Sequence, residues 1–391
     1  MDISKKSGFF MAVFMFNVSN RSNPMIAITR PTLLLNEKQC KINIQQMVDK
    51  AKRLNVQLVP HFKTHQSAEI GEWFKACGIE SITVSSVKMA EFFARSGWKN
   101  ITIAFPFNVH EIPAINKMLD QHVNLTLFVV NTEVVHRLNE ELTAPANLFI
   151  EMDAGYGRSG VSTEDIAKVK ELVGLIEAGS MTNLYGLYCH PGNTYHTNSV
   201  EEIKGIWAGV IKNILAVKTT LGVAGESLRI RVGDTPGCVL VEDMEGVDEI
   251  GPGNFVFYDL VMNYLDVCAE SDIAVAMACP VVAKNESRNE IIIHGGAVHF
   301  SKDHLFDSNE EKFFGEVVVL EEEGWSPIVE GIKLVSLSQE HGVLRASAEV
   351  FEAIEVGDVL GVLPIHSCLT ANLMKSYTTL NGQEIKHLES F

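Results

Sequence analysis

A lysine between two histidines is the feature of the sequence that points most directly to covalent chemistry. Residues 59–65 read VPHFKTH, with Lys63 between His61 and His65 after a short apolar run. A lysine amine in such a setting can have a lowered pKa and form a Schiff base with a carbonyl group. The alternative is an ordinary lysine that reaches solvent at the rim of the fold. The position alone is compatible with both interpretations.

Four later segments place glycines beside hydroxyl, amide or guanidinium side chains, each after a predicted strand. Glycine lets the backbone approach a ligand closely, and its N–H groups can then bind an anion. The sequence therefore predicts an anion site, and in a barrel of alternating strands and helices a phosphate usually binds after strands seven and eight. The segments are 153–160 (DAGYGRSG), 189–196 (CHPGNTYH), 231–237 (RVGDTPG) and 251–254 (GPGN).

A second centre of chemistry is the pair His366 and Cys368. If the pair lies on a strand, side chains two positions apart point to the same side and can bind one ion. Nitrogen together with sulfur favours zinc over magnesium or calcium. The alternative is a buried thiol beside an ordinary histidine.

The elements that must position these residues alternate between short β-branched runs and amphipathic stretches. Eight such alternations predict an α/β fold, a (β/α)₈ TIM barrel, with helices over residues 41–54, 87–97, 163–177 and 200–221. An open, doubly wound sheet is the competing fold, but no glycine-rich dinucleotide fingerprint follows the first strand. The predicted strands are 57–59, 81–85, 101–104, 124–130, 147–152, 184–189, 228–232 and 247–250.

After about residue 266 the sequence changes to strand-like runs joined by short polar turns. This pattern predicts a second, mostly antiparallel β domain. We therefore expect an N-terminal extension over 1–24 that contributes to the β domain, the barrel over 25–265 and the β domain over 266–391. The predicted strands of the β domain are 273–282, 290–294, 315–320, 332–337, 344–350 and 359–363.

Composition excludes several classes of function. A formal net charge of −17 over 391 residues disfavours binding to nucleic acid. No apolar stretch reaches the roughly 20 residues that span a bilayer, and the short apolar run 9–18 lacks the cleavage site of a signal peptide. Seven dispersed cysteines indicate reduced thiols. We expect a cytoplasmic protein that binds neither nucleic acid nor membrane.

Taken in order, these motifs resemble those of the D-serine dehydratase and D-threonine aldolase family. These are fold-type III enzymes that use pyridoxal 5′-phosphate (PLP) and are related to alanine racemase. The resemblance covers nearly the whole chain from about Met25, and six ordered motifs are more specific than any one of them. The motifs are 60–65, 154–161, 190–195, 233–236, 340–342 and 364–368.

The resemblance implies a role for each site residue. Lys63 would bind the cofactor as a Schiff base, with His61 beside it, Arg158 near the phenolic oxygen and His190 near the ring. A divalent metal would bind His366 and Cys368: zinc in the dehydratases, manganese in the aldolases. The family also implies a homodimer in which the β domain of one subunit closes the barrel of the other. The residues implied around the phosphate are Tyr195, Gly233, Thr235, Gly253 and Asn254.

The function implied is that of a PLP-dependent, metal-assisted lyase acting on a small D-β-hydroxy amino acid, with Lys63, His366 and Cys368 as catalytic residues. Cys368 favours D-serine dehydratase chemistry over the alternative, D-threonine aldolase chemistry. An amino-acid racemase would need a second acid–base group opposite Lys63; Tyr156, Tyr195 and Tyr258 are candidates, and none of them stands out. A non-catalytic PLP-binding protein normally consists of the barrel alone, and a barrel without cofactor would not carry these ordered motifs.

Overall fold

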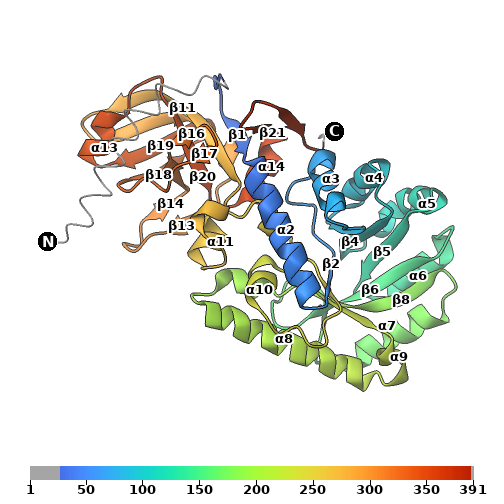
Figure 1. Cartoon of the computed structure of the whole chain (residues 1–391). Helices are drawn as coiled ribbons and strands as arrows, with labels where there is room; N and C mark the ends of the chain where they lie inside the picture. The colour runs from blue at the N-terminus through green and yellow to red at the C-terminus, as the bar shows by residue number, and fades with distance from the viewer. Residues whose placement is uncertain (1–26, 389–391) are drawn as a thin grey trace. The chain divides into compact units, whose positions relative to one another are not determined.

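The structure is a computed structural model that describes residues 27–388. The chain divides into two units, one formed by residues 44–255 and the other by residues 27–43 together with 256–388 (Figure 1). The extension expected over 1–24 lies outside the described residues. Among residues 27–388, no helix is both long and apolar enough to cross a membrane.

Residues 44–255 form a ring of eight parallel strands in the order β2-β10-β9-β8-β6-β5-β4-β3. A bridge between His61 and Thr83 links the end of β2 to β3, so the ring is nearly closed. Each predicted strand of the barrel corresponds to one of these eight, and the TIM-like fold is confirmed. The strands are β2 (Gln57–Leu58), β3 (Ser81–Val84), β4 (Asn100–Pro106), β5 (Asn124–Val129), β6 (Ala146–Asp153), β8 (Thr182–Cys189), β9 (Arg229–Val232) and β10 (Glu249–Ile250); β7 (Val161–Ser162) pairs with β6.

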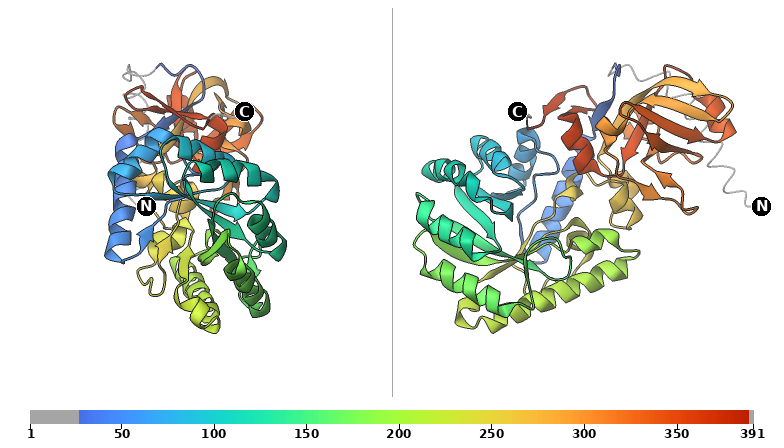
Figure 2. Two further views of the ribbon diagram at one scale, coloured as in Figure 1. Left: turned by 90° about the vertical axis from the view of Figure 1, so that its right-hand side faces the viewer. Right: turned by 180° about the vertical axis from the view of Figure 1, so that it is seen from behind.

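Helices follow the strands along the chain and lie outside the ring (Figure 2). The helix α7 shows why: Val169, Leu172, Val173 and Ile176 recur at helical spacing and are buried, and Asp165 caps its first turn. The four predicted helices are α2, α4, α7 and α8, each within a few residues of its predicted bounds. The helices are α2 (Glu37–Arg53), α3 (Ala68–Ala76), α4 (Val87–Arg95), α5 (Ile112–Asp120), α6 (Thr132–Glu141), α7 (Ile166–Ala178), α8 (Val200–Thr220), α9 (Val223–Glu226) and α10 (Thr235–Leu240).

A buried ion pair fills the interior of the barrel. Arg231 Nη2 lies 2.5 Å from Glu249 Oε2, and both side chains are almost fully buried. The Arg231 guanidinium also donates to Thr102 Oγ1 at 2.9 Å and stacks 4.8 Å above the ring centre of Phe149. Glu249 accepts a further hydrogen bond from Tyr185, at 2.8 Å. These contacts connect β4, β6, β8, β9 and β10 through one pair of charges.

The second unit is built on a six-stranded antiparallel barrel, β11-β12-β19-β18-β15-β20, which closes because β11 pairs with both β12 and β20. The expected antiparallel β domain is confirmed, with β1, β21 and β22 extending the sheet from β11. The strands are β1 (Thr32–Leu35), β11 (Val275–Asn285), β12 (Glu290–His294), β15 (Gly315–Val318), β18 (Ile332–Leu337), β19 (His341–Ala346), β20 (Val359–Pro364), β21 (Ser376–Thr379) and β22 (Glu384–Lys386); the short pairs are β13 (Leu305–Phe306) with β14 (Lys312–Phe313), and β16 (Leu320–Glu321) with β17 (Gly324–Trp325).

Four short helices interrupt this unit, and one of them corrects the predicted strand over 344–350. The strand β19 ends at Ala346, and Ser347 then accepts a hydrogen bond from Val350 N and caps a helix. A serine cap followed by an acidic residue in the first turn favours a helix, and the local apolar run obscured that signal. The helices are α11 (Leu260–Tyr264), α12 (Ala297–Phe300), α13 (Ala348–Ala353) and α14 (Ser367–Met374).

The Arg231–Glu249 pair gives a prediction for stability. Glu249→Gln leaves the Arg231 charge buried without a counter-charge, and we expect the free energy of unfolding to fall by about 3–5 kcal/mol. Urea denaturation followed by circular dichroism measures the change. The control is Glu171→Gln, which breaks an exposed pair with Lys168 and should cost at most about 1 kcal/mol. Equal losses in the two variants would contradict the role of the buried pair.

Candidate active site

Lys63 lies at the carboxyl end of β2, where a chain of aromatic contacts holds its segment. Phe62 is fully buried, and its ring packs 4.3 Å from His65 and 5.1 Å from Trp98, between ring centres. Lys63 itself is exposed, whereas His61, Phe62 and Thr64 are buried. The backbone N–H of Lys63 donates to His61 Nδ1 at 3.3 Å. The local packing therefore anchors the segment and directs the lysine out of the barrel core.

Two histidines whose pKa values the charge of Lys63 lowers, His61 and His190, are neutral at pH 7. Burial, opposed by the hydrogen bond from His190 to the Gly233 carbonyl and assisted by the charges of Arg158 and Lys63, lowers the pKa of His190 to about 4. Burial and then the charge of Lys63 hold the pKa of His61 well below its usual range. At neutral pH the positive charge at this end of the barrel is therefore carried by Lys63 and Arg158. Such a field favours an anionic ligand.

A cradle of hydrogen bonds lies beside this cluster. The Thr235 N–H donates to Tyr195 Oη at 3.0 Å, and the Asn254 N–H donates to Thr235 Oγ1 at 3.1 Å. The His190 and Tyr195 ring centres are 6.1 Å apart. The structure thus brings together three of the residues implied for the phosphate and joins them to the lysine cluster.

The two remaining residues implied for the phosphate are glycines with no room for a side chain. A Cβ added at Gly253 would lie 2.9 Å from the His61 carbonyl oxygen. One added at Gly233 would lie 2.7 Å from Tyr188 Oη and 3.1 Å from the Gly251 carbonyl oxygen. The backbone of both loops therefore comes close to its neighbours because of the glycines. A cradle of hydroxyls, amides and glycine backbone under a positive field fits the phosphate of PLP.

Asp234 shapes the cradle, and the sequence analysis did not single it out. It accepts hydrogen bonds from Trp207 Nε1 at 2.6 Å, Thr194 Oγ1 at 2.8 Å and Gly237 N at 2.7 Å. Burial outweighs these bonds and raises the pKa of Asp234 to about 6. Asp234 is the N-cap of α10, and the sequence Asp-Thr-Pro is a recognisable signal for such a cap.

Glu151 is a second residue that sequence reasoning missed. Its Oε1 accepts a hydrogen bond from Ser159 at 2.8 Å and lies 4.0 Å from Arg158 Nη2. Burial raises the pKa of Glu151, while Ser159 and Arg158 oppose that rise. The carboxyl group thus lies beside the arginine implied at the cofactor, and the only signal in the sequence is an acidic residue within an apolar strand.

The proposed metal ligands His366 and Cys368 do not lie on a strand, which corrects the sequence analysis. The strand β20 ends at Pro364, His366 is the N-cap of α14, and Cys368 belongs to its first turn. The two side chains are nevertheless close enough to interact, because Cys368 contributes to the raised pKa of His366. A helix start brings them together because residues at an N-cap and in the first turn can share one side of the helix. The donor set of one imidazole and one thiol fits zinc.

Two carboxylates bind this segment, one at the His366 ring and one at Ser367 between His366 and Cys368. Asp303 Oδ2 accepts a hydrogen bond from His366 Nδ1 at 2.7 Å. Asp259 Oδ2 accepts hydrogen bonds from the N–H and hydroxyl of Ser367, at 2.9 and 3.2 Å. Burial disfavours a charged ring at His366, but the hydrogen bonds with Asp303 and Cys368 outweigh it and raise its pKa to about 11. A metal that binds the ring must displace a proton, so binding should release protons.

A second candidate metal set consists of His294, His299 and Glu340, whose ligand atoms lie within 4.8 Å of one another. The sequence analysis assigned a role to none of them. Glu340 Oε2 lies 3.5 Å from His294 Nε2 and 3.7 Å from His299 Nε2. However, the Gly296 N–H donates to His299 Nδ1 at 3.0 Å. A neutral His299 then carries its proton on Nε2, which is the wrong tautomer for a metal at that nitrogen.

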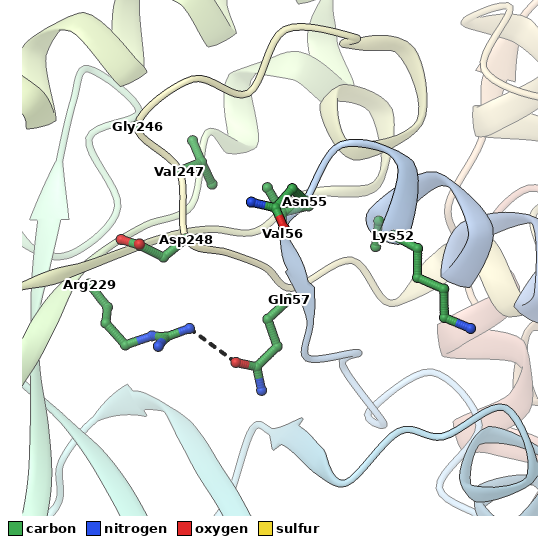
Figure 3. Close-up of a pocket in the computed structure, with 9 residues that line it drawn as sticks. Lys52, Asn55, Val56, Gln57, Arg229, Gly246, Val247 and Asp248 are labelled. Carbon is green, nitrogen blue, oxygen red and sulfur yellow. Dashed lines mark hydrogen bonds between the residues drawn. The ribbon is translucent and has the colours of Figure 1, made fainter.

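A hollow at the opposite end of the barrel contains none of the predicted site residues. It has a volume of about 640 Å³ and lies at the amino ends of β2, β9 and β10 (Figure 3). Arg229 donates to Gln57 across it at 3.0 Å. Polar contacts at this face of a TIM barrel usually serve stability, whereas catalysis takes place at the carboxyl ends of the strands.

One end of the parallel barrel carries a lysine, two neutral histidines and a cradle for an anion. These features agree with the family that the sequence of the chain matches. Residues 35–259 match the family described as "Alanine racemase, N-terminal domain", and residues 274–380 match the "Putative serine dehydratase domain". The first match covers more than half of the chain. The chain therefore belongs to the alanine racemase N-terminal domain family, in the form that carries a serine dehydratase domain. This family is PLP-dependent and metal-assisted.

Similar proteins of this family are dehydratases and aldolases. The chain is 26% identical to D-threo-3-hydroxyaspartate dehydratase of Delftia sp. (strain HT23), covering 91% of this chain and 95% of that protein. It is 27% identical to D-serine dehydratase of Dictyostelium discoideum, covering 91% and 94%. The solved structure of the Delftia sp. HT23 dehydratase matches with a TM-score of 0.86 at 25% identity, covering 95% of this chain and all of that one. D-threonine aldolase from Filomicrobium marinum shares the fold, with a TM-score of 0.78 at 20% identity, over 93% of this chain and 98% of that one.

The glycine contacts predict how the cradle responds to substitution. Gly253→Ala forces a Cβ against the His61 carbonyl oxygen and Thr64 Oγ1, so the loop must move by several tenths of an ångström. We expect the affinity for PLP to fall at least about tenfold as a result. Titration of the cofactor-free protein with PLP, followed by absorbance, measures this. Gly205→Ala is the matched control, because an added Cβ there meets nothing within 4 Å. Unchanged PLP affinity of Gly253→Ala would separate this loop from the cofactor.

Proposed function

We propose that the chain is a PLP-dependent, metal-assisted lyase that acts on a D-β-hydroxy amino acid, most closely in the manner of a D-serine dehydratase. The single observation that carries this proposal is the placement of His366 and Cys368 together at the start of α14, in a chain whose barrel presents Lys63. Alanine racemization alone gives no use for an imidazole and thiol arranged as a zinc donor set. The dehydratase and aldolase relatives support the same class of reaction.

In this proposal Lys63 would hold PLP, which would supply an electron sink for the bonds at Cα. Arg158 keeps a positive charge at the cofactor, with Glu151 beside it. His190 and His61 present neutral rings, because their pKa values are lowered. The phosphate is held by Tyr195, Gly233, Thr235, Gly253 and Asn254.

A divalent cation, zinc or alternatively manganese, supplies a Lewis acid for the substrate hydroxyl when bound to His366 and Cys368. In the dehydratase reaction the Lys63 amine would remove the Cα proton and the hydroxyl group would leave as water. Water would then hydrolyse the resulting enamine, which breaks the C–N bond and gives a 2-oxo acid and ammonia. In the aldolase reaction a base removes the hydroxyl proton, the Cα–Cβ bond breaks, and the products are glycine and an aldehyde. Cys368 supports the first reaction, because the resemblance implies His-x-Cys in the D-serine dehydratases and either His-x-acid or His-x-Cys in the D-threonine aldolases.

The proposal includes an oligomeric state and a cellular location. A homodimer is expected from the resemblance, and sedimentation velocity on the full chain tests it. A cytoplasmic location is expected from the cysteines, all seven of which are free thiols among the described residues.

Product analysis by mass spectrometry tests the reaction. We expect PLP-loaded protein to convert D-serine to pyruvate and ammonia, and a chelator to abolish the product until zinc is added back. Glycine and acetaldehyde from D-threonine would establish the aldolase instead. Formation of the L-enantiomer alone, unaffected by chelator, would contradict the lyase and leave His366 and Cys368 with a structural role.

Lys63→Ala tests the covalent residue. We expect loss of the Schiff-base absorbance and a decrease in turnover of at least about 10²–10⁴-fold, because the variant lacks both the covalent anchor and the base. Absorbance spectra with added PLP and steady-state kinetics measure the two effects. Lys52→Ala, at an exposed position on the opposite side of the barrel strands, should keep the band. If the Lys63→Ala variant keeps the Schiff-base absorbance, Lys63 is not the residue that binds PLP covalently.

A further inference from the structure

The hydrogen bond between Asp303 and His366 determines which ring nitrogen of the histidine can bind a metal. Asp303 Oδ2 lies 2.7 Å from His366 Nδ1. An ionised carboxylate only accepts, so Nδ1 must carry a proton. When the ring gives up its other proton, the lone pair is then on Nε2. We propose that Asp303 is a positioning residue, which holds His366 in the tautomer and orientation that offers Nε2 to the metal beside Cys368. This inference rests on the proposed function, because it assumes the metal at His366 and Cys368.

Asp303 is itself fixed by local structure. The carbonyl oxygen of Phe300, at the end of α12, accepts a hydrogen bond from Thr370 Oγ1 of α14 at 3.3 Å. Ser301 then turns the chain with a φ of 72°, an uncommon value for a residue other than glycine. Its hydroxyl oxygen accepts a hydrogen bond from the Asp303 N–H at 3.1 Å. The segment is therefore tied to the same helix that carries Cys368, which places the Asp303 carboxylate against the His366 ring.

The backbone between the two donors is held separately, by Asp259. This residue is 1% exposed, and its Oδ2 accepts hydrogen bonds from both polar groups of Ser367. Its Oδ1 accepts one from Met262 N at 3.1 Å. Asp259 thus fixes the start of α14, whereas Asp303 fixes the ring of His366. Paired carboxylate and histidine side chains of this kind raise the basicity of the ligand nitrogen and set its orientation.

The His294, His299 and Glu340 set shows the opposite arrangement. There the backbone N–H of Gly296 donates to Nδ1 of His299, so Nδ1 is an acceptor and Nε2 keeps the proton. No carboxylate receives a proton from Nδ1 of His299. Glu340 is therefore a matched control for Asp303: both are partly exposed carboxylates next to a histidine in the same unit, but only Asp303 selects a metal-binding tautomer.

Zinc affinity of the metal-free protein tests the proposal without relying on activity. Zn²⁺ is titrated in competition with a chromophoric chelator, using the full chain. We expect Asp303→Asn to lower the affinity about 10–100-fold, Asp303→Glu to restore part of it, and Glu340→Gln to leave it unchanged. His366→Ala, which removes a ligand, should lose more than Asp303→Asn. Near-UV circular dichroism checks that each variant is folded.

Cobalt gives a readout that a general structural role would not change. Co²⁺ bound by Cys368 should show thiolate charge-transfer absorbance in Asp303→Asn, since the sulfur ligand remains, but with a shifted ligand-field spectrum. Wild-type zinc affinity and an unchanged cobalt spectrum in Asp303→Asn would overturn the positioning role. A loss equal to that of His366→Ala would also overturn it, because Asp303 would then be a ligand. If His366→Ala keeps its zinc while Glu340→Gln loses it, the metal site of the proposed function is wrong.

Discussion

The barrel site depends on a limited positive charge at the carboxyl ends of its strands. Lys63 and Arg158 lie at this end, and burial prevents His61 and His190 from adding two more positive charges. A neutral imidazole can still donate and accept hydrogen bonds, as the bond from His190 to Gly233 shows. The site therefore combines a positive field for an anionic cofactor with uncharged groups that can contact its ring.

In the interior of the same barrel, by contrast, a positive and a negative side chain form an ion pair. Arg231 and Glu249 neutralise each other inside the ring, and hydroxyl groups and an aromatic face satisfy the rest of the guanidinium. This arrangement links five strands through the side chains that contact Arg231 and Glu249. The strand ends above it are then free to carry loops with glycines, and α10, capped by Asp234, begins directly after β9. The rigidity of the interior allows short loops to present the cradle.

Much of the fold follows from local patterns in the sequence, and the exceptions have physical causes. The eight barrel strands were predictable because short, largely apolar runs alternate with amphipathic segments between residues 57 and 250. The helix α14 was not, because His366 is an unusual N-cap that makes no capping hydrogen bond from its side chain, and the apolar run of β20 precedes it directly. A histidine and a cysteine two positions apart could be recognised, but not the carboxylate that orients them. Asp303 and His366 are 63 positions apart, and no period or propensity connects them.

The glycines of the β unit explain how that distant carboxylate reaches its histidine. A Cβ at Gly296 would lie 2.3 Å from the Gln339 carbonyl oxygen, and one at Gly342 would lie 2.5 Å from that of Gly295. These contacts bring the end of β12 against the turn before β19, where the Gly295 N–H donates to the Glu340 carbonyl oxygen at 2.9 Å. Because this turn fixes the start of α12, it also sets where the following segment, with Asp303, can lie. The motif 340–342 of the resemblance and the glycines at 295 and 296 then have a physical reason: their close contacts support the segment that carries the carboxylate beside His366.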